Sequence, residues 1–314
     1  MPRTLLRNTA LLALFSICIF SCEQKQETEL ATILPSDSSL VMKGSESELN
    51  LIQLMSDEFR KKDPSVKVSL QGGGSSLGIK SLIDGEINIA NSSRKMSIDE
   101  ISRANLKDLH PTPIIIATDA VAIITNKCVN MDSLSIGTIS KLLSGAITNW
   151  KEIGGPDLPV TVVGRDENSG TRAFLEEHLL TSGFSPKAYK KSSNKEIIND
   201  VRMIQGAIGY VNYGSIVDAD GRPNRDVWVM SIYVEGDRAY SAYDIEAVKD
   251  GDYALTRPLY QYVNGKPQGA VKDFIKFELS DTQQAQLQYH GYFPLHPLDE
   301  LINRNNCSWL KAGK

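Results

Sequence analysis

The chain has 314 residues, of which 41% are hydrophobic and 23% charged, so it is not a disordered tail, a collagen-like repeat or a multi-span membrane protein. At roughly 100 to 200 residues per domain, this length predicts two lobes or one large domain. The 34 Lys and Arg against 38 Asp and Glu give a formal net charge of -4, which removes the broad positive field that nucleic-acid binding requires.

The N-terminus has the layout of a secretion signal. Two arginines precede a mostly apolar, uncharged run over residues 9–20, which is shorter than the ~20 residues of a membrane-spanning helix. The run ends at Ser21 and Cys22, a small residue followed by cysteine, which resembles a bacterial lipobox. We therefore expect residues 1–21 to be a signal peptide, Cys22 to carry a lipid, and the polar residues 22–39 to form a flexible tether.

The remaining cysteines and the histidines do not suggest a metal site. Cys128 and Cys307 are too far apart in sequence to predict a disulfide, and we expect both to be structural. The four histidines are scattered, and the sequence has no HExxH motif and no Cys/His cluster. We therefore expect no transition metal and no cofactor.

From residue 40 onward, short apolar strands alternate with helical stretches, which predicts an α/β fold. We predict strands at residues 40–42, 66–70, 87–90, 113–116, 119–125, 160–163, 207–213 and 259–263, and helices at residues 49–59, around 79–82, and at 136–143, 171–180 and 271–279. A Ser-x-x-Glu pattern predicts a capping box at Ser45 and Glu48, and another at Ser97 and Glu100. No repeat of fixed period is present, which excludes a solenoid or propeller.

Four turns between a strand and a helix are rich in Gly, Ser or Thr: residues 44–47, 72–76, 91–94 and 165–172. Backbone N–H groups at a helix N-terminus are unpaired and attract anions. In open α/β sheets such turns gather at the carboxyl ends of the strands, and Arg165 would add one positive charge with a fork suited to two oxygens. The residues therefore predict a site for a tetrahedral oxyanion, held by neutral dipoles and one arginine.

Other interpretations of these turns remain open. A single Ser-Gly-Thr turn is more often a helix cap than a ligand site. Residues 72–81 are similar to a phosphate-binding P-loop, but Ile79 follows Gly78 and interrupts the required Gly-Lys-Ser/Thr. Ser169 is not within a G-x-S-x-G motif, and no histidine is placed to suggest a catalytic triad.

The combination of segments resembles the phosphate-binding subunit of the bacterial Pst-type ABC importer, a periplasmic binding protein. The resemblance extends from about residue 40 to about residue 295. Its most specific parts are I-T-N-W-K at residues 147–151 and R-D-x-x-S-G-T-R at residues 165–172, in this order and at this separation.

This resemblance implies a type II periplasmic-binding-protein fold, in which two α/β lobes joined by crossover strands close over one phosphate. The first lobe would comprise residues 40–117 and 257–314, and the second lobe residues 118–256. The implied function is extracytoplasmic capture of inorganic phosphate and its delivery to ABC permease subunits. The protein would be a monomer, anchored in the cell envelope by its lipid, with no covalent chemistry.

The resemblance also implies the phosphate contacts. Ser75 matches a hydroxyl and amide donor after the second strand, and Arg165 matches the arginine that pairs with phosphate. Ser169, Gly170 and Thr171 match the donor turn at a helix start. Glu167 matches the acid that pairs with that arginine and holds its fork in place.

Two positions depart from the family pattern. The first turn has Ser45, Glu46 and Ser47, which puts a carboxylate where a threonine is expected, and Ser93 stands where long-form members have an aspartate. An ionised carboxylate accepts the proton of hydrogen phosphate but repels sulfate, which has none to donate. Our hypothesis is that Glu46 supplies this acceptor while Ser93 donates; the alternative is that Glu46 points to solvent or repels phosphate altogether.

Two other functions remain open at this stage. A lipoprotein sensor, or a binder of another oxyanion, would keep the fold and change the role. A secreted phosphatase or other hydrolase would instead use Ser169 as a nucleophile.

Overall fold

The computed structural model describes residues 35–218 and 221–311. The predicted signal peptide, the lipidation site Cys22 and all but the last residues of the predicted tether lie outside these ranges. No helix in the described part of the chain is both long and apolar enough to cross a membrane.

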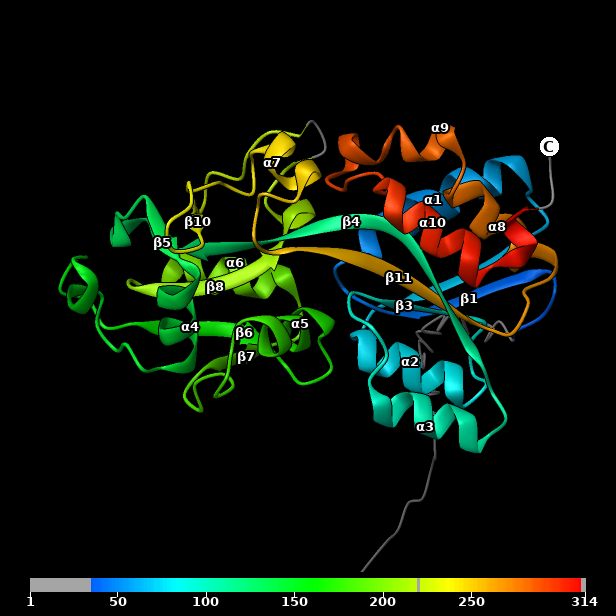
Figure 1. Ribbon diagram of the computed structural model, residues 1–314, viewed down its shortest axis with the longest axis horizontal. Helices are drawn as coiled ribbons and strands as arrows, with labels where there is room; N and C mark the ends of the chain where they lie inside the picture. The colour runs from blue at the N-terminus through cyan, green and yellow to red at the C-terminus, as the bar shows by residue number, and fades with distance from the viewer. Residues whose placement is uncertain (1–34, 219–220, 312–314) are drawn as a thin grey trace, which may run out of the picture. The chain divides into compact units, whose positions relative to one another are not determined.

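Three parallel strands and the helices that follow them form the first lobe. The strands are β1 (Ser39–Gly44), β2 (Lys67–Gln71) and β3 (Ile89–Ser92), and the helices are α1 (Leu49–Lys62), α2 (Ser75–Ile83) and α3 (Ile98–Leu106). Helices α1 and α8 (Gly269–Glu278) cover one face of this sheet, and α2 and α3 cover the other (Figure 1). Because all three strands run in the same direction, their carboxyl ends lie at one edge of the sheet.

Two long antiparallel strands connect the lobes. They are β4 (Pro111–Thr125) and β11 (Thr256–Asn264), which pair along almost the whole length of β11 and run side by side in Figure 1. The sheet order is β2-β1-β3-β11-β4, continued by β8 (Ala207–Asn212), β6 (Thr161–Arg165) and β7 (Tyr189–Lys191). Alternation along β4 places Ile114 and Ile116 in the core cluster beneath α1 and α8, and Ile115 in the cluster beneath α2 and α3.

The second lobe has its own hydrophobic core around β6 (Thr161–Arg165), β8 (Ala207–Asn212) and the second half of β4. Its other elements are α4 (Ile136–Ser144), α5 (Gly170–His178), β7 (Tyr189–Lys191), α6 (Asn194–Met203), β9 (Trp228–Val229), α7 (Ile245–Asp250) and a two-stranded sheet of β5 (Ser133–Ser135) and β10 (Ser231–Tyr233). The chain ends with α9 (Asp281–Gln284) and α10 (Pro297–Asn306).

The predicted strand and helix segments are present, with two local differences. The two strands predicted at residues 113–116 and 119–125 are one continuous strand, β4. The capping box at Ser97 and Glu100 is confirmed, whereas the one predicted at Ser45 and Glu48 is wrong. Glu48 itself is the residue before α1, and the Ser45 hydroxyl accepts instead from the Ser47 N–H at 3.2 Å.

Both predicted structural cysteines are free thiols in the structure, Cys128 exposed and Cys307 buried. Burial raises the pKa of the Cys307 thiol to about 11. At neutral pH Cys307 is therefore protonated and behaves as a small apolar core residue.

Candidate functional site

The carboxyl ends of β1, β2 and β3 bring four predicted serines to one edge of the first lobe. Ser45, Ser47, Ser75 and Ser93 are all buried. Ser75 is the first residue of α2, and its hydroxyl oxygen accepts from the Ser93 N–H at 3.1 Å and lies 3.4 Å from the Ser93 hydroxyl. Hydroxyls and helix N-termini therefore occupy this edge, as the sequence predicted.

The turn after β6 forms the facing part of the second lobe. Ser169 is the N-cap of α5, and its hydroxyl oxygen accepts from the Arg172 N–H at 3.2 Å. Gly170 and Thr171 are the first two residues of α5, so their N–H groups have no carbonyl partner inside the helix. All three residues are buried, and the helix dipole adds partial positive charge at this point.

The structure brings these two turns into direct contact. The Ser47 and Thr171 hydroxyls lie 3.0 Å apart, and both side chains are buried. A Cβ atom at Gly170 would lie 2.2 Å from Ser75 Oγ and 2.6 Å from Ser93 Oγ. Residues from four separate turns therefore meet at one place between the lobes.

Sequence reasoning missed a buried arginine at this place. Arg257 Nη2 donates to Ser47 Oγ and to Thr171 Oγ1, each at 3.0 Å. The same nitrogen donates to Asp119 Oδ2 at 2.9 Å, and the two side chains are 1% and 0% exposed. Among the described residues, Arg257 Nη1 and Asp119 Oδ1 have no hydrogen-bond partner. The available signal was a charge beside each of two apolar predicted strands, with Asp119 at the start of residues 119–125 and Arg257 two residues before residues 259–263.

Arg165, the arginine that the sequence selected, is held by its own lobe. Its side chain donates to the Lys191 carbonyl at 3.3 Å, the Ser192 carbonyl at 2.7 Å and Asn194 Oδ1 at 3.4 Å. Burial lowers the pKa of Arg165, and the nearby Glu46 carboxylate opposes that shift. Arg165 thus contributes positive charge near the first turn while its hydrogen bonds orient it within the second lobe.

The predicted pairing of Glu167 with Arg165 is wrong. The Glu167 side chain is 65% exposed and forms an ion pair with Lys190 on the surface. Hydrogen bonding to Lys190 lowers the pKa of Glu167. Backbone carbonyls and Asn194 occupy the donors of Arg165, so this arginine does not need a carboxylate to hold its fork.

Glu46 is half-buried and connects two of the predicted turns. Its Oε1 atom accepts from the Gly73 N–H at 2.7 Å, and a Cβ atom at Gly72 would lie 1.9 Å from the same oxygen. Glycine at position 72 therefore permits the close approach. Ser45 stabilises the first turn. Its N–H donates to the Asn91 carbonyl at 2.9 Å, and its hydroxyl oxygen accepts from the Ser47 N–H.

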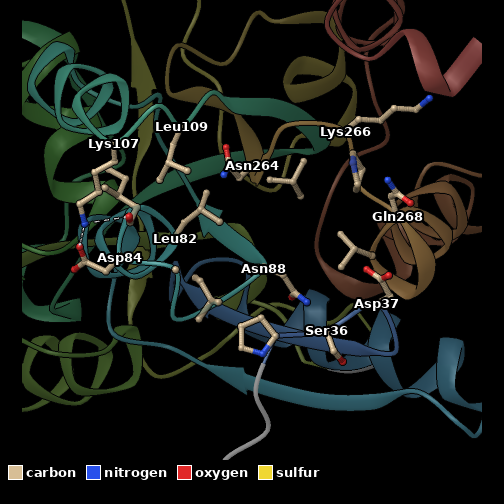
Figure 2. A pocket seen from close by; sticks show the side chains of 17 residues that line it. Ser36, Asp37, Leu82, Asp84, Asn88, Lys107, Leu109, Asn264, Lys266 and Gln268 are labelled. Atoms are coloured by element: carbon tan, nitrogen blue, oxygen red, sulfur yellow. Dashed lines mark hydrogen bonds and ion pairs between the residues drawn. The ribbon is translucent and has the colours of Figure 1, made fainter.

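A separate pocket of about 690 Å³ lies on the first lobe, next to the start of β1 (Figure 2). None of the predicted site residues lines this pocket. The charged groups Lys107 and Asp84 are paired at 2.6 Å, and Asn88 donates to the Ser39 carbonyl at 2.8 Å. Lys266 also lines this pocket, but none of the four predicted donor turns contributes to it, so the turn cluster between the lobes is the better candidate.

Comparison with known proteins agrees with this geometry. A family model described as a PBP superfamily domain matches residues 28–282. The chain belongs to the PBP superfamily. Over 258 residues it is 25% identical to the protein named Phosphate-binding protein PstS of Bacillus subtilis, covering 82% of this chain and 81% of that protein.

Two solved structures share the fold of this PBP superfamily chain. A candidate phosphate ABC transporter substrate-binding protein with bound phosphate from Clostridium perfringens is 27% identical, with a TM-score of 0.71, covering 82% of this chain and all (100%) of that one. An ABC-type phosphate transport receptor from Vibrio cholerae is 26% identical, with a TM-score of 0.64 and coverage of 82% and 100%. The predicted two-lobe α/β fold and the stated resemblance are confirmed.

Proposed function

We propose that this protein binds inorganic phosphate outside the cytoplasm and delivers it to an ABC importer. The observation that carries the proposal is the cluster of Ser47, Thr171 and Arg257, which joins hydroxyls of both lobes to one buried cation. The names of the relatives from Bacillus subtilis and Clostridium perfringens support the choice of phosphate.

We propose that the phosphate oxygens lie against the starts of α2 and α5. Ser75 and Ser93 would donate from the first lobe, and the Gly170 and Thr171 N–H groups from the second. Arg257 Nη1 has no hydrogen-bond partner among the described residues. It can therefore donate a charged hydrogen bond to phosphate without first breaking another one. A ligand that bonds to both lobes stabilises only the closed arrangement, so binding would drive closure.

The proposed lobe boundaries are residues 40–117 with 257–314, and residues 118–256. Strands β4 and β11 support them, because each runs from one core into the other near residues 117–121 and 256–259. One residue lies across the boundary: Phe293 belongs to the core cluster of the second lobe, with its ring centroid 5.2 Å from that of Tyr213. We propose that this contact belongs to the hinge.

The proposal also includes lipid anchoring through Cys22, a monomeric state and the absence of covalent chemistry. The Ser169 hydroxyl supports the last point, because its oxygen caps α5 and the side chain is buried. This position suits an anchor for a helix start better than a nucleophile, which needs a base within reach. Glu167, with its carboxylate on the surface, has no proposed contact to phosphate.

Titration of the full chain in detergent tests the function. After unfolding and refolding to remove carried-over ligand, we expect phosphate and arsenate to bind one-to-one and sulfate to give little heat in calorimetry. Replacing Thr171 by valine removes the hydroxyl that accepts from Arg257 Nη2 and should weaken phosphate binding about 10- to 100-fold, since a hydrogen bond to a charged group is worth about 1.5–3 kcal/mol. No binding of any of the three anions by the unaltered chain would reject the proposal and favour a sensor of another ligand.

Glu46→Gln tests the proposed source of phosphate selectivity. If Glu46 accepts the proton of hydrogen phosphate, the variant should lose roughly 10-fold or more of its preference for phosphate over sulfate. Its proximity to Arg165 supports this role, although Oε1 already accepts from Gly73. The measurement is a competition titration with sulfate, and an unchanged preference would contradict the hypothesis.

A further inference from the structure

Two buried glutamates lie near the turn at residues 44–47, and the proposed phosphate site uses neither of them. Glu48 immediately precedes α1 and is 0% exposed, and Glu278 is the last residue of α8 and is 3% exposed. Fully buried glutamates are rare unless paired with a cation or donor. Neither residue forms an ion pair in the described part of the chain.

Acceptors outnumber donors around these two carboxyl groups. Among the described residues, neither oxygen of Glu48 has a hydrogen-bond partner of good geometry, and neither Glu278 Oε2 nor Gln261 Oε1 has one. Gln261 Nε2 donates to Glu278 Oε1 and to Asn91 Oδ1, each at 3.3 Å. A buried carboxylate without donors is strongly disfavoured, and a bound proton removes this cost most simply.

Several groups face Glu48 from the elements packed against it. They are the Ser45 hydroxyl in its own turn, the Ser92 N–H at the end of β3, Asp119 on β4, Arg257 and Tyr262 on β11, Glu278 on α8, and Tyr292 after α9. The Ser45 and Ser92 groups approach Glu48 without reaching full hydrogen-bond geometry. Arg257 is therefore the main attraction for an ionised Glu48, and Arg257 is bonded to Asp119.

Burial raises the pKa of Glu48 well above its ordinary value, and the positive charge of Arg257 partly opposes the rise. Burial also raises the pKa of Glu278, and Glu48 adds to that rise. Burial raises the pKa of Asp119 as well, but the positive charge of Arg257 and its direct bonds to Asp119 oppose that rise. The proton thus resides on Glu48 or Glu278 rather than on Asp119.

We propose that Glu48 is a proton-binding site coupled to the anion site, so that the protein takes up a proton from solvent as it binds phosphate. This inference rests on the proposed function. A phosphate dianion at Arg257 Nη1 engages the cation that favours ionised Glu48, and it adds negative charge near the carboxylate. Phosphate affinity should therefore fall as pH rises through the range in which Glu48 ionises, because the ionised form repels the ligand.

Calorimetry in two buffers of different ionisation enthalpy tests the coupling on the full chain. At a pH well above the second pKa of phosphoric acid, free phosphate is a dianion, so proton uptake that disappears in Glu48→Gln is assigned to the protein and uptake that persists there to the ligand. At a pH that ionises Glu48 in the phosphate-free protein but not in the complex, we expect uptake approaching about one proton per phosphate in the unaltered chain and none in Glu48→Gln; at lower pH Glu48 is already protonated and the uptake falls toward zero. Glu58→Gln is the matched control, because Glu58 lies on α1, the helix that Glu48 precedes, with a side chain that is 41% exposed and paired with Lys61, and it should keep the uptake.

Equilibrium dialysis with radiolabelled phosphate separates failure of this inference from failure of the proposed function. No retained phosphate in the unaltered chain would overturn the function itself. Phosphate binding without proton uptake, or uptake that persists in Glu48→Gln, would overturn the coupling alone. If Glu48→Gln does not fold, the unaltered chain still tests the coupling. A phosphate affinity that does not fall as pH rises through the range in which Glu48 ionises would contradict the inference.

Discussion

Replacing Arg257 by methionine should lower phosphate affinity by at least about 100-fold and the free energy of unfolding by about 3–5 kcal/mol. The loss of affinity follows from removal of the only cation that contacts hydroxyls of both lobes among the described residues. The loss of stability follows because Asp119, which is 0% exposed, would remain buried without its partner. Calorimetric titration and urea unfolding measure the two effects separately.

A second substitution distinguishes these two roles of Arg257. Replacing Arg257 by methionine and Asp119 by leucine together removes the whole buried ion pair, which is often neutral or stabilising. We expect this double variant to recover stability and not phosphate binding. Arg304→Met removes an exposed pair with Glu300 and should change both quantities little. Ordinary phosphate affinity in Arg257→Met would show that Arg257 does not hold the ligand.

Local patterns predicted the strands, helices and turns because each of these features is determined by neighbouring residues. Short apolar runs marked β1 and β4, and small polar residues marked the turns that meet at the site. The Arg257–Asp119 pair spans 138 positions and depends on the register of β4 against β11, in which the two residues lie directly opposite each other. The local sequence pattern of either strand does not predict that register.

The two Ser-x-x-Glu patterns show the same limit. Glu100 is bonded to Arg94 and to the Ser97 N–H, so it closes the capping box. Glu48 has the same local sequence, but its carboxyl group lies buried within the field of Arg257, and its helix begins without a side-chain cap. Tertiary surroundings therefore decided which of the two motifs formed. Tertiary contacts also decided the partner of Glu167, which pairs with Lys190 on the surface and not with Arg165.

Replacing Gly170 by alanine should reduce phosphate affinity by at least about 100-fold while leaving the unfolding free energy almost unchanged. The added Cβ would lie 2.2 Å from Ser75 Oγ, 2.6 Å from Ser93 Oγ and 2.9 Å from Ser75 Cβ. These atoms lie on the opposite lobe, so the clash opposes closure rather than folding of either lobe. Alanine is itself well tolerated in the first turn of a helix.

Gly137→Ala is the matched control, since Gly137 also lies in the first turn of a second-lobe helix, α4. The nearest atom to its added Cβ would be Glu235 Oε1, at 2.9 Å, and this exposed side chain can move away; the next atoms are at 3.8 Å or more. Small-angle scattering with and without phosphate should show ligand-induced compaction in the unaltered chain and in Gly137→Ala, and none in Gly170→Ala. Compaction and unchanged phosphate affinity in Gly170→Ala would contradict this prediction. The lobes would then bind phosphate without bringing Gly170 against Ser75, and the contact between the four turns would not belong to the ligand-bound state.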